Sequence, residues 1–513
     1  MRSVSGTPRG FGSPARTQIL TLVAILVRTF TIEKMQLDDN ILNQFISPNG
    51  SNRQLVEQTI QKVTTQLLDF LTNASNKPTN PSLQLFDTKH FQIPDISKTE
   101  TEIKESLQEF YDLSMNPANP KYIGHMDSMP TLWAIIGDYV ASALNNNLLS
   151  LEMSPVITQL EYSMTKQFAT LFGLPNSAGG VMLSGGTLSN LQALLVARNT
   201  KLNIKNGNIF SIKKEPVIFT SEHSHASIQK IGMMIGIGTE NVLKVKTDEN
   251  SKIDISDLES QIKEQIKLGK QPFAIVATAG TTVSGNIDPL NEISVIANKH
   301  DLWLHIDAIY GGAVIFSDTY KHLINGIEKA NSISYNPQKW MYVAKTCSMV
   351  LFRDFDKMVE KFRISAPYMK DQNSYINLGE ISVQGTKYAE VVKLWLSLLS
   401  LGKNGYEQLI DYSFDLTKKF IEEVSKRNYL KLVSRPEMNL ICFRGEPTNL
   451  NASELDSWNE KLQSYLVKET DFFLSLPKYK NSLWLRTVLL NPFLTHKHIE
   501  NLFEHIDKFE KNN

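Results

Sequence analysis

The sequence predicts an α/β protein with a large domain built on a mostly parallel sheet, a helical N-terminal arm and a smaller α+β C-terminal domain. Apolar residues recur at helical spacing over residues 36–115, and short apolar runs alternate with helical patterns from about 120 to 360. After about 380 a long helical pattern leads into mixed α and β elements. Apolar strands separated by helices are typical of a parallel sheet that helices cover on both faces.

Composition excludes several classes of function. The 513 residues include 53 Lys and Arg against 53 Asp and Glu, and no basic stripe carries interleaved aromatics. We therefore expect no nucleic-acid and no membrane partner. The only cysteines, Cys347 and Cys442, are too few for a disulfide framework. Since no C-x-x-C or His/Cys cluster occurs either, we expect no metal and a reduced, cytoplasmic location.

The first 35 residues form a separate N-terminal extension. Residues 1–32 contain four arginines, no Asp or Glu, and an apolar run at 19–27 that is too short to span a bilayer. This composition fits an organellar presequence, or a read-through from an earlier start with Met35 opening the ordinary sequence. A secretory signal fits less well because cysteines are so few.

The helical arm is expected at 36–118, the large domain at 119–380 and the small domain at 381–513. Within the arm, LVEQTIQKVTTQLLDFL has apolar residues at helical spacing, and a Pro/Asn/Ser-rich break follows at 74–82. An arm this apolar must bury its stripe, and a two-fold-related copy is the commonest partner. We therefore expect a homodimer.

Ligands in open α/β sheets bind at the carboxyl ends of the strands. The predicted strands are GGVML (179–183), PVIFT (216–220), FAIVATAG (273–280), LWLHIDA (302–308) and SMVLF (348–352). The first is followed by SGGTLSN and the helical run LQALLVAR. Small residues at the start of a helix let backbone N–H groups approach a phosphate, although such turns are often only structural.

Three other polar features follow later strands. SEHSHAS places His223 and His225 after the second strand, and LWLHIDA places His305 and Asp307 on one strand face with Asp307 at its end. A strand-end Asp needs a cation or several hydrogen bonds, and a protonated pyridine nitrogen would serve. Lys339 is isolated in NPQKWMYV, where its amine either extends past apolar neighbours to solvent or acts as a nucleophile.

Together these elements are what pyridoxal 5'-phosphate requires. Its phosphate must be anchored, its ring covered, its nitrogen kept protonated and its aldehyde held by an amine. Each signal is weak alone, and their combination in this order predicts a pyridoxal phosphate site.

Over roughly residues 110–500 the sequence also resembles the group II pyridoxal-phosphate-dependent amino-acid decarboxylases, relatives of aromatic-amino-acid and glutamate decarboxylases. The motifs that carry the resemblance are GGVMLSGGTLSN, SEHSHASIQKIG, ATAGTTVSGNIDPL, LWLHIDAIYGG, NPQKW and LWLRTVLLNP. The resemblance implies the aspartate-aminotransferase type of fold and a homodimer with active sites at its interface. The implied reaction converts a small-molecule L-amino acid to its amine and CO2.

The resemblance also implies a role for each matching residue. These roles are the Schiff base for Lys339, the ring nitrogen's partner for Asp307, ring stacking for His225, phosphate binding for Gly186, Thr187 and Asn336, a place near the ring for Thr282, substrate contact for His125 and Arg486, and the proton donor for Tyr368. His223 does not match a histidine of the family.

Two departures leave the substrate open. Gln338 stands where the family commonly has His, and it cannot titrate. VQGTKYAEVVKLW is nearer the glutamate-type relatives, whereas Trp340 is nearer the aromatic type. An aldehyde synthase is the main alternative activity, disfavoured because Tyr368 and His225 are both retained. A non-catalytic relative is the less favoured alternative, because the chain keeps Lys339 as well as the strand-end Asp.

Overall fold

The computed structural model describes residues 37–80, 91–204, 207–365 and 376–513. The chain forms two compact units. One comprises the described residues within Met1–Phe70 and Ser97–Gln108, and the other comprises those within Leu71–Ile96 and Glu109–Asn513. Each unit is described by itself.

The smaller unit is helical. It contains α2 (Asp39–Leu42), most of α3 (Arg53–Thr72) and the start of α4 (Glu100–Leu113). Gln66 of α3 donates to the Lys104 carbonyl of α4 at 3.0 Å, so the two helices lie side by side. No residue of α3 or α4 is buried, so the apolar positions of both helices remain accessible.

A seven-stranded sheet organises the larger unit, with the order β1-β7-β6-β5-β4-β2-β3. The strands are β1 (Gly179–Leu183), β2 (Pro216–Ser221), β3 (Val242–Val245), β4 (Gln271–Thr278), β5 (Trp303–Asp307), β6 (Ser332–Tyr335) and β7 (Ser348–Phe352). Only β7 is antiparallel to its neighbours β1 and β6. The predicted α/β class with a mostly parallel sheet is confirmed, and β1 runs in the same direction as β6.

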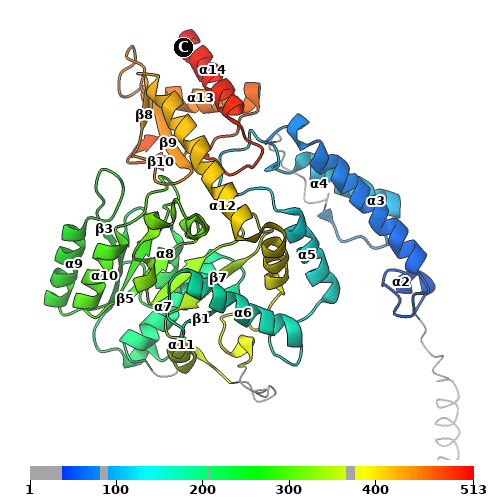
Figure 1. Cartoon of the computed structure of the whole chain (residues 1–513), viewed down its shortest axis with the longest axis horizontal. Helices are drawn as coiled ribbons and strands as arrows, with labels where there is room; N and C mark the ends of the chain where they lie inside the picture. The colour runs from blue at the N-terminus through cyan, green and yellow to red at the C-terminus, as the bar shows by residue number, and fades with distance from the viewer. Residues whose placement is uncertain (1–36, 81–90, 205–206, 366–375) are drawn as a thin grey trace, which may run out of the picture. The chain divides into compact units, whose positions relative to one another are not determined.

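Helices cover this sheet (Figure 1). They are α6 (Pro155–Leu171), α7 (Gly186–Lys201), α8 (Ser227–Met234), α9 (Ile255–Lys267) and α10 (Leu290–Lys299). Helix α11 (Phe355–Phe362) packs on α7, and α5 (Leu132–Leu144) packs on α12 (Glu390–Ser425). Helix α7 contacts β1, β4, β5, β6 and β7, which makes it the central helix on its face. Between β5 and β6 the chain forms only the 3-10 turns η4 (Gly311–Phe316), η5 (Lys321–Ile324) and η6 (Ile327–Lys329).

Helix α12 (Glu390–Ser425) joins the large sheet to the C-terminal part of the chain. It contacts α5, α6 and η4, and it also contacts β8 (Leu430–Leu432) and α14 (His496–Asn512). Its helical geometry is interrupted at Gly402, where φ is 60°. The small antiparallel sheet has the order β12-β9-β8, with β9 at Leu440–Gly445 and β12 at Leu485–Val488.

The small domain has a hydrophobic core of its own. Phe420 of α12 packs edge-on against Phe443 of β9 and Phe503 of α14, with ring centroids 5.4 and 4.9 Å apart. Helix α13 (Leu455–Thr470) and the hairpin of β10 (Lys478–Tyr479) and β11 (Ser482–Leu483) complete it. The predicted smaller α+β C-terminal domain is therefore present.

Candidate active site

The carboxyl ends of β1, β2, β4, β5 and β6 meet at one edge of the large sheet, where they surround a cavity of about 190 Å³. The residues that line it are Met126, Gly186, Thr187, His225, Ser227, Thr278, Gly280, Thr282, Asp307, Ile309, Tyr310, Asn336, Gln338 and Lys339. All seven residues that the sequence analysis assigns to the cofactor thus line a single cavity.

One wall of the cavity is the turn from β1 into α7. Gly185 has φ 109°, which favours glycine, and Gly186 opens the helix. A Cβ on Gly186 would lie 2.3 Å from Ile309 Cδ1 and 3.2 Å from Asn336 Nδ2, so a larger residue would have to displace both side chains. The Ser348 hydroxyl donates to Asn336 Oδ1, which leaves the Nδ2 group as a free donor beside the helix N-terminus. This wall suits a phosphate group.

The two histidines of SEHSHAS separate. His225 lines the cavity, whereas the ring of His223 packs against Tyr479 at a centroid distance of 4.4 Å. The backbone N–H of Ser227 donates to His225 Nδ1 at 3.2 Å, so the proton of the neutral ring is on Nε2. Burial lowers the pKa of His225, against the opposing effect of the Asp307 charge. A neutral imidazole with a free Nε2–H therefore faces the cavity.

Asp307 and Lys339 form the opposite part of the cavity wall. Asp307 Oδ2 accepts from Asn190 Nδ2 at 2.9 Å and Oδ1 accepts from the Ile309 N–H at 3.2 Å. Within the described residues no Lys or Arg forms an ion pair with this carboxylate. The Lys339 amine lies 3.7 Å from Met126 Sδ, and burial lowers its pKa while the Asp307 charge raises it. The amine is thus more readily neutral than an exposed lysine.

Arg486 and His125 lie beside the cavity and touch each other. Arg486, on β12, donates from Nη2 to His125 Nδ1 at 3.1 Å and from Nη1 to the carbonyl of the cavity residue Thr282 at 2.8 Å. Its other bonds are to the Ser475 hydroxyl and the Gly124 carbonyl, at 2.9 and 3.0 Å. Arg486 is buried, and no carboxylate in the described part of the chain pairs with it. Burial lowers the pKa of both Arg486 and His125.

The sequence analysis missed Thr278 as a functional candidate. Its hydroxyl is buried in the cavity wall and has no hydrogen-bond partner among the residues described. Thr278 stands opposite Asp307 in the β4–β5 register, so both end their strands at the same level. The sequence signal that could have identified Thr278 is a polar residue at the end of an apolar strand.

Gln338 also reaches the cavity, and its orientation is fixed. Its Oε1 accepts from the Cys347 N–H at 2.7 Å, so its amide N–H groups are left for other acceptors. Tyr368 and its loop neighbour Tyr375 lie outside the described residues.

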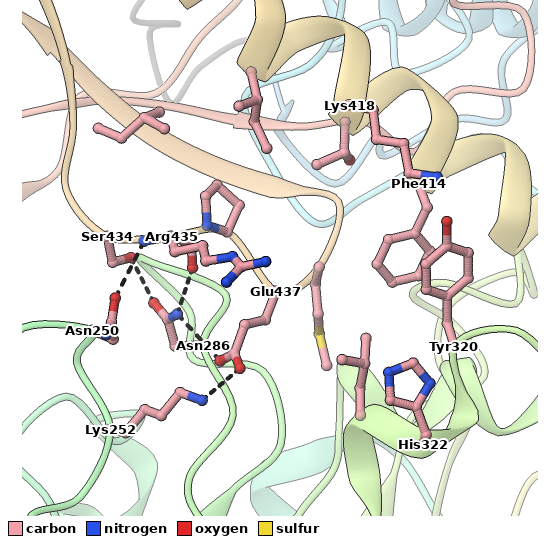
Figure 2. Close-up of a pocket in the computed structure, with 16 residues that line it drawn as sticks. Asn250, Lys252, Asn286, Tyr320, His322, Phe414, Lys418, Ser434, Arg435 and Glu437 are labelled. Carbon is pink, nitrogen blue, oxygen red and sulfur yellow. Dashed lines mark hydrogen bonds and ion pairs between the residues drawn. The ribbon is translucent and has the colours of Figure 1, made fainter. Parts of the chain in front are cut away.

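A larger groove of about 820 Å³ lies next to this site, and Figure 2 shows that the polar groups on one side of it bond to one another. Lys252 pairs with Glu437 at 2.5 Å, and Asn286 Nδ2 donates to the other oxygen of Glu437 at 3.3 Å. These bonds fix the β8–β9 connection on the large domain. Met438 then packs against Gly280, 2.9 Å from where a Cβ would be, at the back of the small cavity.

The described residues contain neither a metal-binding cluster nor a membrane-spanning helix. Over 37–80, 91–204, 207–365 and 376–513, no group of three or more His, Cys, Asp or Glu could hold a metal ion. In the same ranges none of the helices combines the length and apolarity needed to cross a membrane.

The cavity fits pyridoxal phosphate. The Gly186 turn and Asn336 Nδ2 suit the phosphate, the unpartnered Thr278 hydroxyl needs an acceptor, Asp307 needs a cation, and Lys339 is an amine of lowered pKa. Such a site at the strand ends of a mostly parallel sheet defines an α/β pyridoxal-phosphate enzyme.

The chain belongs to the pyridoxal-dependent decarboxylases, whose conserved domain matches residues 79–446. It is 31% identical to rat cysteine sulfinic acid decarboxylase over 420 residues, which cover 79% of this chain and 85% of the relative. It is 26% identical to a mouse acidic amino acid decarboxylase over 488 residues, 92% of this chain and 88% of the relative.

Solved structures agree with this assignment. The crystal structure of mouse CSAD in apo form has a TM-score of 0.83 at 28% identity, covering 89% of this chain and 99% of that one. The structure of Oryza sativa TDC with PLP and tryptamine has a TM-score of 0.85 at 21% identity, covering 91% and 99%, and shows the shared fold. The protein is a pyridoxal-phosphate-dependent amino-acid decarboxylase, as the sequence motifs predicted.

Proposed function

We propose that the protein decarboxylates an acidic L-amino acid, with cysteine sulfinate as the first candidate, and that Arg486 binds an acidic group of the substrate. The observation that carries the proposal is a buried guanidinium without a carboxylate partner in the described chain, beside the cofactor cavity. Burying an unpaired charge is costly, so a ligand carboxylate is the expected counter-ion. The acidic substrates named for the rat and mouse relatives point the same way.

Eight residues have proposed roles toward the cofactor. Bound pyridoxal phosphate supplies the electron sink that accepts the electrons left at Cα when CO2 departs. Lys339 holds the cofactor covalently through Nζ, and its lowered pKa favours the neutral amine that this requires. Asp307 keeps the ring nitrogen protonated, and His225 covers the ring. Asn336 binds the phosphate, together with Gly186, Thr187 and the hydroxyl of Thr278, while Thr282 lies near the ring.

The remaining roles concern the substrate. His125, bonded to Arg486, contacts the substrate at the cavity entrance. The apolar walls formed by Met126 and Ile309 favour loss of the charged carboxylate as neutral CO2. Tyr368 returns the proton to Cα, a task that suits a phenol because the carbon is strongly basic at that stage.

We test the substrate class by measuring CO2 release from cysteine sulfinate, aspartate and glutamate against tryptophan, DOPA and 2,4-diaminobutyrate. The highest kcat/KM is expected for an acidic substrate, and preference for an aromatic or diamino acid would contradict the proposal. Arg486→Gln should raise KM roughly 30-fold or more, since loss of one partner of a buried charged pair costs about 2 kcal/mol or more. Arg444→Gln is the matched control, because Arg444 is equally buried but pairs with Asp456 at 3.2 Å.

We also propose a homodimer with its interface next to the active site. Leu132, Trp133 and Val156, in α5 and at the start of α6, are 65%, 47% and 76% exposed. Helix α5 begins after Thr131, whose N–H donates to the Tyr342 carbonyl close behind Lys339, so the exposed face adjoins the site. Exposed apolar patches of this kind mark interfaces.

The dimer is tested by sedimentation. Leu132→Asp should weaken association and lower activity in parallel with dissociation. Val295→Asp is the control, because Val295 on α10 is similarly exposed, at 64%, without belonging to this face. A fully active monomer would contradict the proposal.

We further propose that the chain is divided into an extension at 1–35, an arm at 36–118 and domains at 119–380 and 381–513. We also propose a cytoplasmic location, which cell fractionation tests.

A further inference from the structure

Behind the cavity wall, five buried side chains form a continuous hydrogen-bond relay that ends on Asp307. Trp303 Nε1 donates to Ser332 Oγ at 2.8 Å, and Ser332 Oγ lies 2.9 Å from His305 Nδ1. His305 Nε2 lies 3.0 Å from Asn190 Oδ1, and Asn190 Nδ2 donates to Asp307 Oδ2 at 2.9 Å. Ser332, His305 and Asn190 have no exposed surface.

An ionised Asp307 allows only one arrangement of protons along this relay. A carboxylate accepts, so Asn190 must turn its NH2 group toward Asp307 and its oxygen toward His305. His305 then carries its proton on Nε2, and its bare Nδ1 accepts from the Ser332 hydroxyl. That hydroxyl is free to donate because it accepts from the Trp303 N–H, which can only donate. Every polar atom is satisfied.

A proton on Asp307 Oδ2 would disturb the whole relay, whereas a proton on Oδ1 would leave the bond from Asn190 intact and lie on the oxygen that the Ile309 N–H contacts. With the proton on Oδ2, Asn190 would have to present its oxygen, so the amide would rotate and offer its NH2 group to His305 Nε2. His305 would then move its proton to Nδ1, toward the Ser332 carbonyl at 3.2 Å. Burial lowers the pKa of His305 to about 4, so the imidazole does not supply a second proton instead. One protonation event thus requires two further rearrangements inside a packed core.

We propose that Asn190 and His305 are positioning residues that hold Asp307 ionised and correctly oriented for the cofactor's ring nitrogen. The relay stabilises the Asp307 carboxylate through the bond from Asn190 to Oδ2, while the Ile309 N–H donates to Oδ1. Burying a polar chain in a core costs more than apolar packing of the same volume, so its presence here points to a task. The relay ends on Asp307, a carboxylate that lines the cavity, which indicates that its task is to support this carboxylate.

The inference rests on the proposed role of Asp307, and the test separates the two. Each variant is loaded with pyridoxal phosphate that carries an NMR-active isotope at the ring nitrogen, and the protonation of that nitrogen is followed against pH. The wild-type ring should stay protonated through neutral pH. Asn190→Leu and His305→Leu should let it titrate in that range, whereas His305→Gln should behave as wild type, because Gln can both accept from Ser332 and donate to Asn190.

Gln192→Leu is the matched control. Gln192 is a buried amide on the same helix, and it bonds to the Ile381 carbonyl and the Val383 N–H instead of the relay. Its loss should lower stability without changing the ring nitrogen. If Gln192→Leu has the same effect as Asn190→Leu, or if His305→Leu matches His305→Gln, the inference is wrong. Where Asn190→Leu does not fold, the two His305 variants decide.

Asp307→Asn distinguishes the remaining outcomes. If the ring nitrogen titrates in Asp307→Asn but not in Asn190→Leu or His305→Leu, Asp307 acts as proposed and the relay inference alone is overturned. If the ring nitrogen stays protonated in Asp307→Asn as well, the proposed role of Asp307 fails, and the relay has no function at the cofactor.

Discussion

Gly186→Ala tests whether the turn before α7 holds the cofactor phosphate. The added methyl carbon would lie 2.3 Å from Ile309 Cδ1 and 3.2 Å from Asn336 Nδ2. The Ile309 contact is with the end of a flexible side chain, which can rotate away. The Asn336 contact cannot relax in this way, because the Ser348 hydroxyl fixes that amide from the other side. The methyl group therefore displaces either the amide donor or the phosphate it serves.

Loss of one hydrogen bond to a charged group costs about 1.5–3 kcal/mol, which corresponds to a roughly 10- to 150-fold weaker Kd for pyridoxal phosphate. Equilibrium dialysis of the cofactor measures this directly. Gly385→Ala is the control, since a Cβ there meets no atom within 4 Å. The double variant with Ile309→Ala should stay impaired because Asn336 still opposes the methyl. Full recovery in the double variant, or an unchanged Kd in the single one, would refute the placement of the phosphate.

Three other substitutions have defined outcomes. Lys339→Ala should abolish turnover and leave no covalently attached cofactor after borohydride reduction, and mass spectrometry that finds the cofactor on another lysine would overturn the assignment. Lys387→Met leaves Glu161, its buried partner at 3.0 Å, uncompensated. This should lower the free energy of unfolding in urea by about 3–5 kcal/mol, and adding Glu161→Gln should restore much of it. Tyr368→Phe should still release CO2 but divert product to aldehyde, whereas Tyr375→Phe should keep the wild-type ratio of amine to CO2; the reverse result would exchange their roles.

Most of the large sheet could be predicted because its strands are apolar on both faces. The predicted bounds of β1 and β7 agree with the structure, and β2, β4 and β5 agree within two residues. The sequence analysis assigned no residues to strand β6, because its run SISY is only four residues long and has serine at every second position. Both serines are buried, since Ser332 bonds to His305 and Ser334 lies 3.5 Å from the same ring. A partner on the neighbouring strand, invisible in the local sequence, makes these polar residues compatible with a core.

The site was predictable where residues directly follow a strand and unpredictable where a distant element contributes. His225 follows β2 and Asp307 ends β5, so the strand-end rule finds them, whereas Asn336 follows the unassigned strand β6 and was named only through the family resemblance. Arg486 lies on β12 of the small domain, and only the family resemblance pointed to it. Asn190 lies in the motif SGGTLSN, but the sequence analysis gave it no role. It is one turn into α7, and its side chain bonds to Asp307 and His305 behind the cavity instead of lining the loop.

The register of the sheet explains how the cavity and the relay are built together. Thr278, Asp307 and Ser334 are partners across β4, β5 and β6, and they form a row at the cavity. Two residues earlier, His305 and Ser332 form a second row on the same face, because side chains alternate along a strand. The intervening Ile306 points to the other face, and a slip of one residue would turn both rows to that other face. The same ladder that places Asp307 at the cavity therefore places its hydrogen-bond support one row earlier on the same face, so any shift of register would remove both together.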